Sequence, residues 1–369
     1  MLRSGRGRRS PAVTRWLLVL ALAALAAWAC SPALMGASAA KKAHAASPCP
    51  QLFGSFSVGH WPPACWRPYG PSSPFNTPIP THPRLAPGSA AIVAYMHSRG
   101  WTFEGDRSHR FTIDSGGSRP VYWSSNSDPQ VSLRCHGEPS CRAIKHLRIP
   151  AGAQPQHESD GHMTVVDQSA GREYDFWQAS VRRHGAMTAS AASSIPIGAD
   201  SGTGLGGHAE AANLGLLGGL IRAPELATGT IEHALVTTAQ CVQSRDVWPA
   251  SGGGDAVCPG GHRGPHFGSL LQLNMSDGEI AASGAPSWQR TIMTAMAHYG
   301  IYVVDTNGAG NREMSLLSED DQSFTSFGFP GQMRKFVASV AQGASQATGV
   351  PIDVSKLRVI APCVPRHTC

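Results

Sequence analysis

Hydrophobic residues follow a helical period in three stretches of the chain. The first begins at Ser89, which is suited to cap a helix, and ends at Gly100. The longest lies between Ser287 and Gly300, and its apolar face carries Trp288, Ile292, Ala295, Met296 and Tyr299. The third covers Gln332 to Val340. We predict a helix in each stretch.

Alternating or short apolar runs bounded by turn residues predict β-strands elsewhere. Met163–Asp167 and Arg172–Gln178 flank a short link in which Gly171 can adopt a positive φ, so they predict a β-hairpin. The other predicted strands are Arg119–Trp123, Gln130–Leu133, Thr230–Val236, Ser269–Leu273 and Ile301–Asp305. We therefore expect a mainly β fold with a few helices, a single β-sandwich-like or jelly-roll-like domain over residues 88–369.

The start of the chain predicts export. Residues 1–40 have the layout of a secretory signal peptide, because five arginines precede the apolar run Trp16–Ala29. Small-residue cleavage signals follow at Ala37–Ala39 and Ala43–Ala45, whereas the residues before Cys30 match a lipoprotein processing site poorly. We expect a secreted protein and favour secretion over lipid anchoring at Cys30.

The charge of the chain is concentrated in this leader. Lys+Arg 30 against Asp+Glu 24 gives +6, and removing the five leader arginines leaves 25 − 24 = +1. A nearly neutral body cannot neutralise many phosphates, which argues against a nucleic-acid partner. After the leader, no apolar run approaches the roughly 20 residues that span a bilayer, so we expect no stable membrane span.

Eight cysteines remain after the leader, and they fall as sequence neighbours. Because short loops close with the least loss of entropy, we predict neighbour pairs. The predicted disulfides are Cys49–Cys65, Cys135–Cys141, Cys241–Cys258 and Cys363–Cys369. No Cys-x-x-Cys pair occurs, which disfavours a zinc ribbon or a thioredoxin-type redox site. The first pair lies in residues 41–87, a proline-rich stretch that predicts an extended lead-in without a helix or central strand.

The second strand of the predicted hairpin carries an acidic row. Glu173, Asp175 and Trp177 share one face, and Tyr174 and Phe176 share the other, which we assign to the core. The two carboxylates are about 7 Å apart along a strand, a spacing at which glycosidases divide acid and base or nucleophile roles. The indole beside them offers a surface on which a sugar ring can stack. A solvated outer strand face is the alternative interpretation.

Several segments together resemble a family of secreted bacterial proteins whose activity is not established. The similar segments are Ser159–Met163, Val165–Asp167, Tyr174–Trp177, Gly215–Arg222, Glu225–Leu226, Gly229–Leu235 and Gln289–Asp305. The resemblance implies a shared fold and site over roughly residues 159–305, but no particular activity. The acidic strand also resembles the Glu-x-Asp-x-x-Glu strand of laminarinase-type glucanases, which are jelly-roll sandwiches, although Gln178 replaces the third acid.

Two histidines are candidates for acid–base chemistry. Asp160 and His162 precede a predicted strand on loop backbone, where an aspartate can orient an imidazole. His233 lies in a predicted strand between aliphatic residues, where a hydrogen-bonded core role is the alternative. A metal site would recruit His157 beside Asp160 and His162, and we predict no metal and no cofactor.

We expect a carbohydrate-active protein that cleaves an extracellular polysaccharide by hydrolysis, or by β-elimination if the substrate is a uronate polymer. The predicted catalytic residues are Glu173, Asp175, His162, His233 and Asp160, and the predicted substrate-binding residues are Trp177, Arg222 and Asp305. The chain has no Gly-x-Ser-x-Gly elbow and no phosphate loop, which disfavours acyl transfer and nucleotide binding. A non-catalytic carbohydrate-binding or cell-wall module is the alternative, and the oligomeric state is left open.

Overall fold

The computed structural model describes residues 49, 53–103, 110–111, 118–145, 147–182, 186–198, 202–253, 256–261, 263–307, 313–340, 347–348 and 350–369. Residues 46–369 group as one compact unit. The predicted leader, residues 1–40, lies outside the described residues.

Strands dominate the described part of the chain, as the apolar pattern predicts. They are β1 Thr102–Phe103, β2 Arg110–Phe111, β3 Ser118–Arg119, β4 Val121–Ser124, β5 Gln130–Cys135, β6 Leu147–Arg148, β7 Met163–Asp167, β8 Arg172–Trp177, β9 Ser180–Val181, β10 Ala186–Ala189, β11 Ala191–Pro196, β12 Leu235–Ala239, β13 Leu270–Leu273, β14 Ile301–Thr306, β15 Glu313–Met314, β16 Ser318–Glu319, β17 Ala347–Thr348 and β18 Leu357–Ile360. The mainly β fold class is confirmed.

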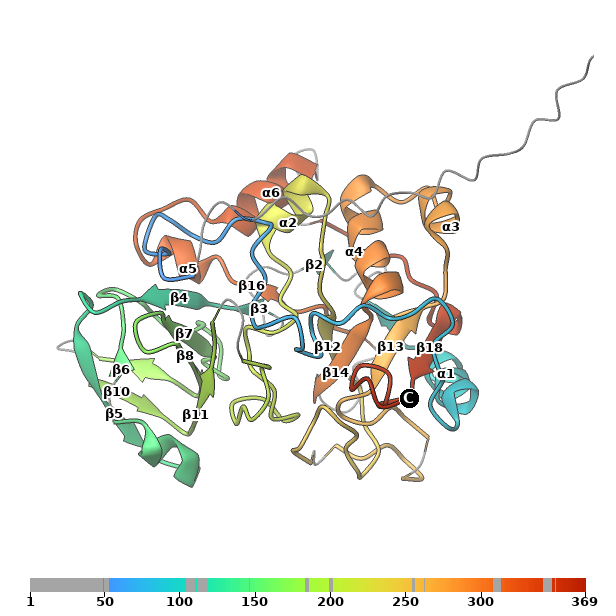
Figure 1. Ribbon diagram of the computed structural model, residues 1–369, viewed down its shortest axis with the longest axis horizontal. Coiled ribbons are helices and arrows are strands. Elements are labelled where there is room, and N and C mark those ends of the chain that lie inside the picture. Colours follow the sequence, from blue (N-terminus) through green and yellow to red (C-terminus); the bar gives the residue numbers. More distant parts are fainter. Residues whose placement is uncertain are drawn as a thin grey trace, which may run out of the picture. The chain divides into compact units, whose positions relative to one another are not determined.

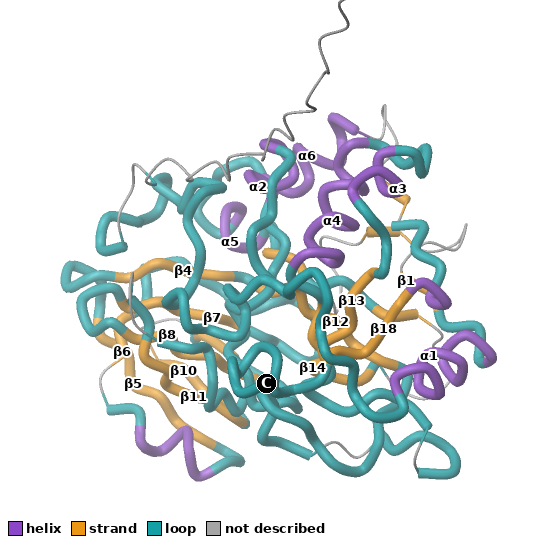
Figure 2. The backbone as a smooth tube through the Cα atoms, turned by 45° about the vertical axis from the view of Figure 1, so that its right-hand side comes forward, coloured by secondary structure: helices purple, strands orange, loops and turns teal. Residues whose placement is uncertain are grey.

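The helices are short, and those that the sequence predicts are all present. They are α1 Ser89–Ser98, α2 Ala223–Thr228, α3 Asp277–Ala281, α4 Ser287–His298, α5 Gln322–Thr325 and α6 Gln332–Val340, with 3₁₀ turns η1 Pro139–Ala143 and η2 Val354–Lys356. In two views, α2, α3, α4 and α6 lie on the same side of the strands (Figures 1 and 2).

Two four-stranded sheets enclose the smaller of two cores. Their strand orders are β11-β8-β7-β4 and β6-β5-β10-β9, and both are seen in Figure 1. The predicted hairpin is confirmed as β7 and β8, and Gly171 in its link has φ 60°. Tyr174 and Phe176 point into this core as expected, together with Met163 and Met187. This pair of sheets is consistent with a β-sandwich.

A jelly roll is not confirmed. That fold is built from antiparallel strands, whereas β4 pairs with β7, β5 with β10, and β12 with β14 in parallel.

The larger core lies around the sheet β12-β14-β13-β18 and includes apolar residues of α1 and α4. The proline-rich lead-in contributes to it: Phe56, Trp66, Tyr69 and Phe75 are buried there. Described residues 53–87 contain no helix and no named strand, as the prolines predict. The lead-in is therefore an integral part of this core.

Most predicted strands keep their bounds to within one or two residues, and two differ further. Pro120 separates β3 from β4 within the predicted strand Arg119–Trp123, because proline lacks the N–H that a ladder needs. The strand predicted for Thr230–Val236 begins only at Leu235. The Thr230 N–H instead donates to the Glu225 carbonyl at the end of α2, so the chain enters β12 through a turn.

All four predicted disulfides form, namely Cys49–Cys65, Cys135–Cys141, Cys241–Cys258 and Cys363–Cys369. Several disulfides in one chain indicate an oxidising environment. Among the described residues, no helix combines the length and apolar character needed to cross a membrane.

Candidate functional site

The predicted acidic row begins in the interior and reaches the surface at one end. Glu173 and Asp175 are fully buried, whereas Trp177 is 36% exposed. Glu173 Oε2 accepts a hydrogen bond from the Tyr69 hydroxyl at 2.7 Å, and Oε1 accepts one from the Leu217 N–H at 3.0 Å. The carboxylate thus joins the sheet to the lead-in and to the loop before α2.

Asp175 is held in the same way. It accepts hydrogen bonds from the Thr164 hydroxyl at 2.8 Å, the Leu216 N–H at 3.2 Å and the Ser193 hydroxyl at 3.4 Å. Burial raises the pKa of Asp175 well above its ordinary value, and the neighbouring carboxyl of Glu173 raises it further. A hydrogen bond joins the two carboxyl groups. Since glycosidase pairs stand about 5 Å or more apart, these contacts favour a structural role.

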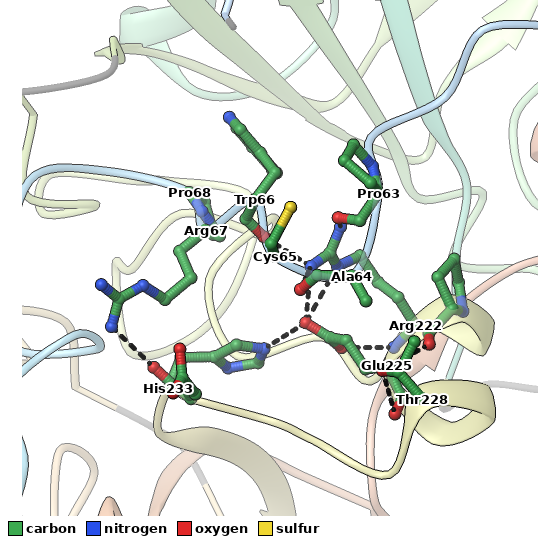
Figure 3. A network of polar contacts seen from close by, with 12 residues as sticks. Pro63, Ala64, Cys65, Trp66, Arg67, Pro68, Arg222, Glu225, Thr228 and His233 are labelled. Carbon is green, nitrogen blue, oxygen red and sulfur yellow. Dashed lines mark hydrogen bonds and ion pairs between the residues drawn. The ribbon is translucent and has the colours of Figure 1, made fainter. Parts of the chain in front are cut away.

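His233 and Arg222 belong to a second buried network, shown in Figure 3. His233 Nε2 lies 3.1 Å from Glu225 Oε1, and Nδ1 lies 3.0 Å from the Ala234 carbonyl oxygen. Both partners are hydrogen-bond acceptors, so the imidazole is held at both ring nitrogens. The side chains of His233 and Glu225 are each 1% exposed. No polar atom of this imidazole is directed to solvent.

Arg222 ties the same carboxylate to the lead-in. Its Nη2 donates to Glu225 Oε1 at 2.6 Å and to the Trp66 carbonyl at 2.6 Å. Longer hydrogen bonds reach the carbonyls of Pro63 and Ala64. Arg222 and His233 lower the pKa of Glu225 against the opposing effect of burial. The contacts of Arg222 and His233 favour fixing the fold over binding a substrate.

The other predicted residues meet at the surface end of the acidic row. Met163 pairs with Phe176, so His162 lies opposite Trp177 on the neighbouring strand. Val121 pairs with Thr164, which places Arg119 at the same end, two residues before β4 meets β7. Gln178 N–H donates to the Asp160 carbonyl at 2.7 Å and holds the exposed Asp160 beside Trp177.

Arg119 lies at the centre of this group, and the sequence did not identify it as a site residue. Its Nη2 donates to both carboxylate oxygens of Glu210, at 3.2 and 3.3 Å, and both side chains are almost fully buried. Glu210 in turn hydrogen-bonds to Asp305, which is half-buried at the end of β14. The carboxyl pair therefore runs from the interior toward the surface.

Electrostatics keep a proton on this pair. Burial raises the pKa of Glu210 to about 8, with Arg119 opposing the rise and Asp305 reinforcing it. Burial also raises the pKa of Asp305, and the carboxylate of Asp160 adds to that rise. At neutral pH, Glu210 holds the proton and donates it in the hydrogen bond to Asp305.

His162 is buried beside Arg119. Burial lowers its pKa well below the ordinary value, and the guanidinium of Arg119 lowers it further. The imidazole is therefore neutral at pH 7. Its Nδ1 is buried and has no hydrogen-bond partner among the described residues, so one ring nitrogen is available for a further contact.

We call this group the Arg119 cluster: Arg119, Asp160, His162, Trp177, Glu210 and Asp305. It unites four predicted residues and adds two that the sequence analysis missed. One signal was available for Glu210, because an acid flanked by alanines is unusual on a solvated segment. Arg119, next to Pro120, offered no comparable signal.

Within the described residues, no group of three or more His, Cys, Asp or Glu side chains is arranged to hold a metal ion. No protein-family model, curated protein or solved structure matches the chain. The family resemblances drawn from the sequence stay predictions.

Proposed function

We propose that this is a secreted protein that hydrolyses glycosidic bonds of an extracellular polysaccharide at the Arg119 cluster. The observation that carries the proposal is the Glu210–Asp305 pair, which holds a proton at neutral pH and extends from a buried guanidinium to a half-buried carboxyl. A glycosidase needs one carboxyl group that stays protonated at neutral pH and a second that stays ionised.

Asp305 is the general acid in this proposal. The proton starts on Glu210, moves along the hydrogen bond to Asp305, and passes from Asp305 to the oxygen of the leaving sugar. Glu210 then carries a negative charge, and the two hydrogen bonds from Arg119 stabilise it. The buried ion pair thus forms when the proton leaves.

Asp160 supplies the second carboxyl group. It is exposed and acts on Asp305 electrostatically, and no hydrogen bond joins the two in the described contacts. This arrangement suits a base or nucleophile that faces the acid across the scissile bond. Trp177 lies beside Asp160 and offers an exposed indole for stacking on a sugar ring. His162 Nδ1 provides one further hydrogen bond at the same end of the sheet.

The test is cleavage of a mixed panel of cell-wall and plant polysaccharides by the purified protein, with products identified by mass. Asp305→Asn and Asp160→Asn are each expected to reduce product formation by about 100-fold or more. The matched control is Glu138→Gln, because Glu138 is an exposed acid on a different segment. Absence of products from the wild type, or full activity of Asp305→Asn, would refute the proposal. Unsaturated products would show that the protein cleaves its substrate by elimination and not by hydrolysis.

A non-catalytic binding module is the second candidate, and the exposed Trp177 favours it. In that case Trp177→Ala abolishes polysaccharide binding, Asp305→Asn leaves binding intact, and no products appear with the wild type. Pull-down on insoluble polysaccharide, run beside the cleavage assay, separates the two functions.

A further inference from the structure

A separate concavity of about 480 Å³ lies between α4 and the turn that follows α2. We call it the α4 pocket and define it by Thr230, Glu232, Arg290, Thr291, Thr294 and Tyr299. Its volume falls in the range of small-ligand sites, about 300–1,000 Å³.

The α4 pocket is distinct from the Arg119 cluster. Tyr299 is followed by Gly300 and then by Ile301, the first residue of β14, whereas Asp305 lies near the far end of that strand. Four residues of extended chain separate Ile301 from Asp305, about 13 Å. A ligand in the α4 pocket therefore does not contact the carboxyl pair.

The polar groups that line the α4 pocket are of both kinds, donors and acceptors. Arg290 donates one hydrogen bond to the Ala285 carbonyl, and Thr291 donates to the Ser287 carbonyl at 3.1 Å. In the described contacts, the carboxylate of Glu232 and the hydroxyls of Thr294 and Tyr299 have no hydrogen-bond partner. These three groups are free to bind a ligand.

Charge and shape select the chemical class of that ligand. Burial raises the pKa of Tyr299, the carboxylate of Glu232 adds to the rise, and the guanidinium of Arg67 opposes it. Glu232 and Arg290 line the α4 pocket with opposite charges. An anion such as a phosphate or a uronate is therefore repelled by Glu232 and a cation by Arg290, so a neutral ligand is favoured. An apolar ligand would leave the free hydroxyls and the carboxylate unpaired, at a cost in binding.

A neutral sugar matches all of these groups. Its hydroxyls donate to Glu232, accept from Arg290 and exchange hydrogen bonds with Thr294, while a C–H face packs against the half-buried ring of Tyr299. We propose that the α4 pocket is a binding subsite for a neutral hexose or pentose unit of an oligosaccharide. The subsite does not depend on catalysis at the Arg119 cluster.

The experiment is calorimetric titration of the purified protein with cellotetraose, mannotetraose and xylotetraose, and with tetragalacturonic acid as the anionic comparison. At least one neutral tetrasaccharide is expected to bind, and the anionic one to bind at least tenfold more weakly. Thr294→Trp, which fills the α4 pocket, and Glu232→Gln are each expected to weaken binding about tenfold, a loss of about 1.4 kcal/mol. Glu138→Gln is the matched control.

Asp305→Asn separates this proposal from the proposed hydrolysis, because it should abolish cleavage and leave calorimetric binding unchanged. Thermal melting reports whether Thr294→Trp folds. Glu232 is half-buried and glutamine keeps its volume, so Glu232→Gln tests the site even if the larger substitution does not fold. Failure of all three neutral sugars to bind, or wild-type binding by Glu232→Gln, would overturn the subsite whatever happens to cleavage.

Discussion

Replacing Glu225 by glutamine should detach the lead-in from the rest of the fold. Glu225 accepts four hydrogen bonds, from Arg222 N at 2.9 Å, Arg222 Nε at 3.2 Å, Arg222 Nη2 at 2.6 Å and His233 Nε2 at 3.1 Å. The amide keeps the volume of the carboxylate but loses its charge, and its NH₂ group faces donors. The substitution leaves a buried guanidinium without its counter-charge.

The magnitude follows from these contacts. Four hydrogen bonds at about 1 kcal/mol net each give about 4 kcal/mol, which lies within the roughly 3–5 kcal/mol measured when one partner of a buried ion pair is removed. The free energy of unfolding of Glu225→Gln should fall by that amount, which changes the folding equilibrium about 700-fold. Because Arg222 also holds the carbonyls of Pro63 and Trp66, local opening should start there.

The assay is urea denaturation, combined with hydrogen exchange of residues 63–69. Glu138→Gln, the same exchange at an exposed position, should leave the free energy of unfolding within about 0.5 kcal/mol of the wild type. Glu319 is buried within electrostatic range of Arg222, and burial raises its pKa to about 8. Glu319 can supply a second counter-charge to Arg222 when Glu225 is replaced. The double variant Glu225→Gln with Glu319→Gln removes both carboxyl groups. Loss of less than 1 kcal/mol in both the single and the double variant would refute the reasoning.

Three further predictions concern stability. Burial raises the pKa of Asp175, so its protonated form is favoured in the folded state and stability is lost as pH rises from the ordinary carboxyl range through the raised pKa. Asp175→Asn should therefore gain stability relative to the wild type as the pH rises above about 4, and a pH-independent difference in urea midpoints would contradict this. Gly219→Ala should cost about 1–3 kcal/mol more than Gly260→Ala, because both positions have positive φ (76° and 86°) but a Cβ at Gly219 lies 2.9 Å from backbone of β12, whereas none lies within 4 Å at Gly260. Equal losses in the two melting temperatures would show that packing does not decide the outcome. Replacing Cys241 and Cys258 together by serine opens a 17-residue separation and should cost about 3 kcal/mol, measured by denaturation with the other disulfides intact. An unchanged denaturation midpoint would show that the Cys241–Cys258 disulfide does not stabilise the fold.

The parts of the fold that depend on neighbouring residues could be predicted from the sequence. The β7–β8 hairpin and the inward direction of Tyr174 and Phe176 follow from alternation over a few residues. The long helix α4 follows from its apolar face. The disulfides follow from the short loops that they close. Each of these features is decided within about 20 residues of chain.

The state of the acidic row could not be predicted, because its partners are distant in sequence. Alternation shows that Glu173 and Asp175 share a face, but the backbone that covers them, at Leu216 and Leu217, comes more than 40 positions later than Glu173. Tyr69 reaches the same carboxyl group from 104 positions earlier. Local patterns therefore give the face of a side chain and not what covers it.

The same reason explains Arg222 and His233. Their residue types suit a substrate site, but the carbonyls that Arg222 binds lie 156 to 159 positions away, in the lead-in. The Arg119 cluster is similar, because Arg119 meets Glu210 across 91 positions. Only Asp160, His162 and Trp177, which adjacent strands bring together, could be associated from the sequence alone.

The lead-in also constrains the order in which the molecule is completed. Leu85 and Ala86 close its path by pairing with β18, through a bridge to Ile360 and a hydrogen bond to the Val359 carbonyl. A ribosome makes these two segments about 270 residues apart, so the Leu85–Ala86 segment can pair only after the last strand has been made. At roughly 5–20 residues per second, that interval is on the order of tens of seconds. During it, the Leu85–Ala86 segment has no strand with which to pair.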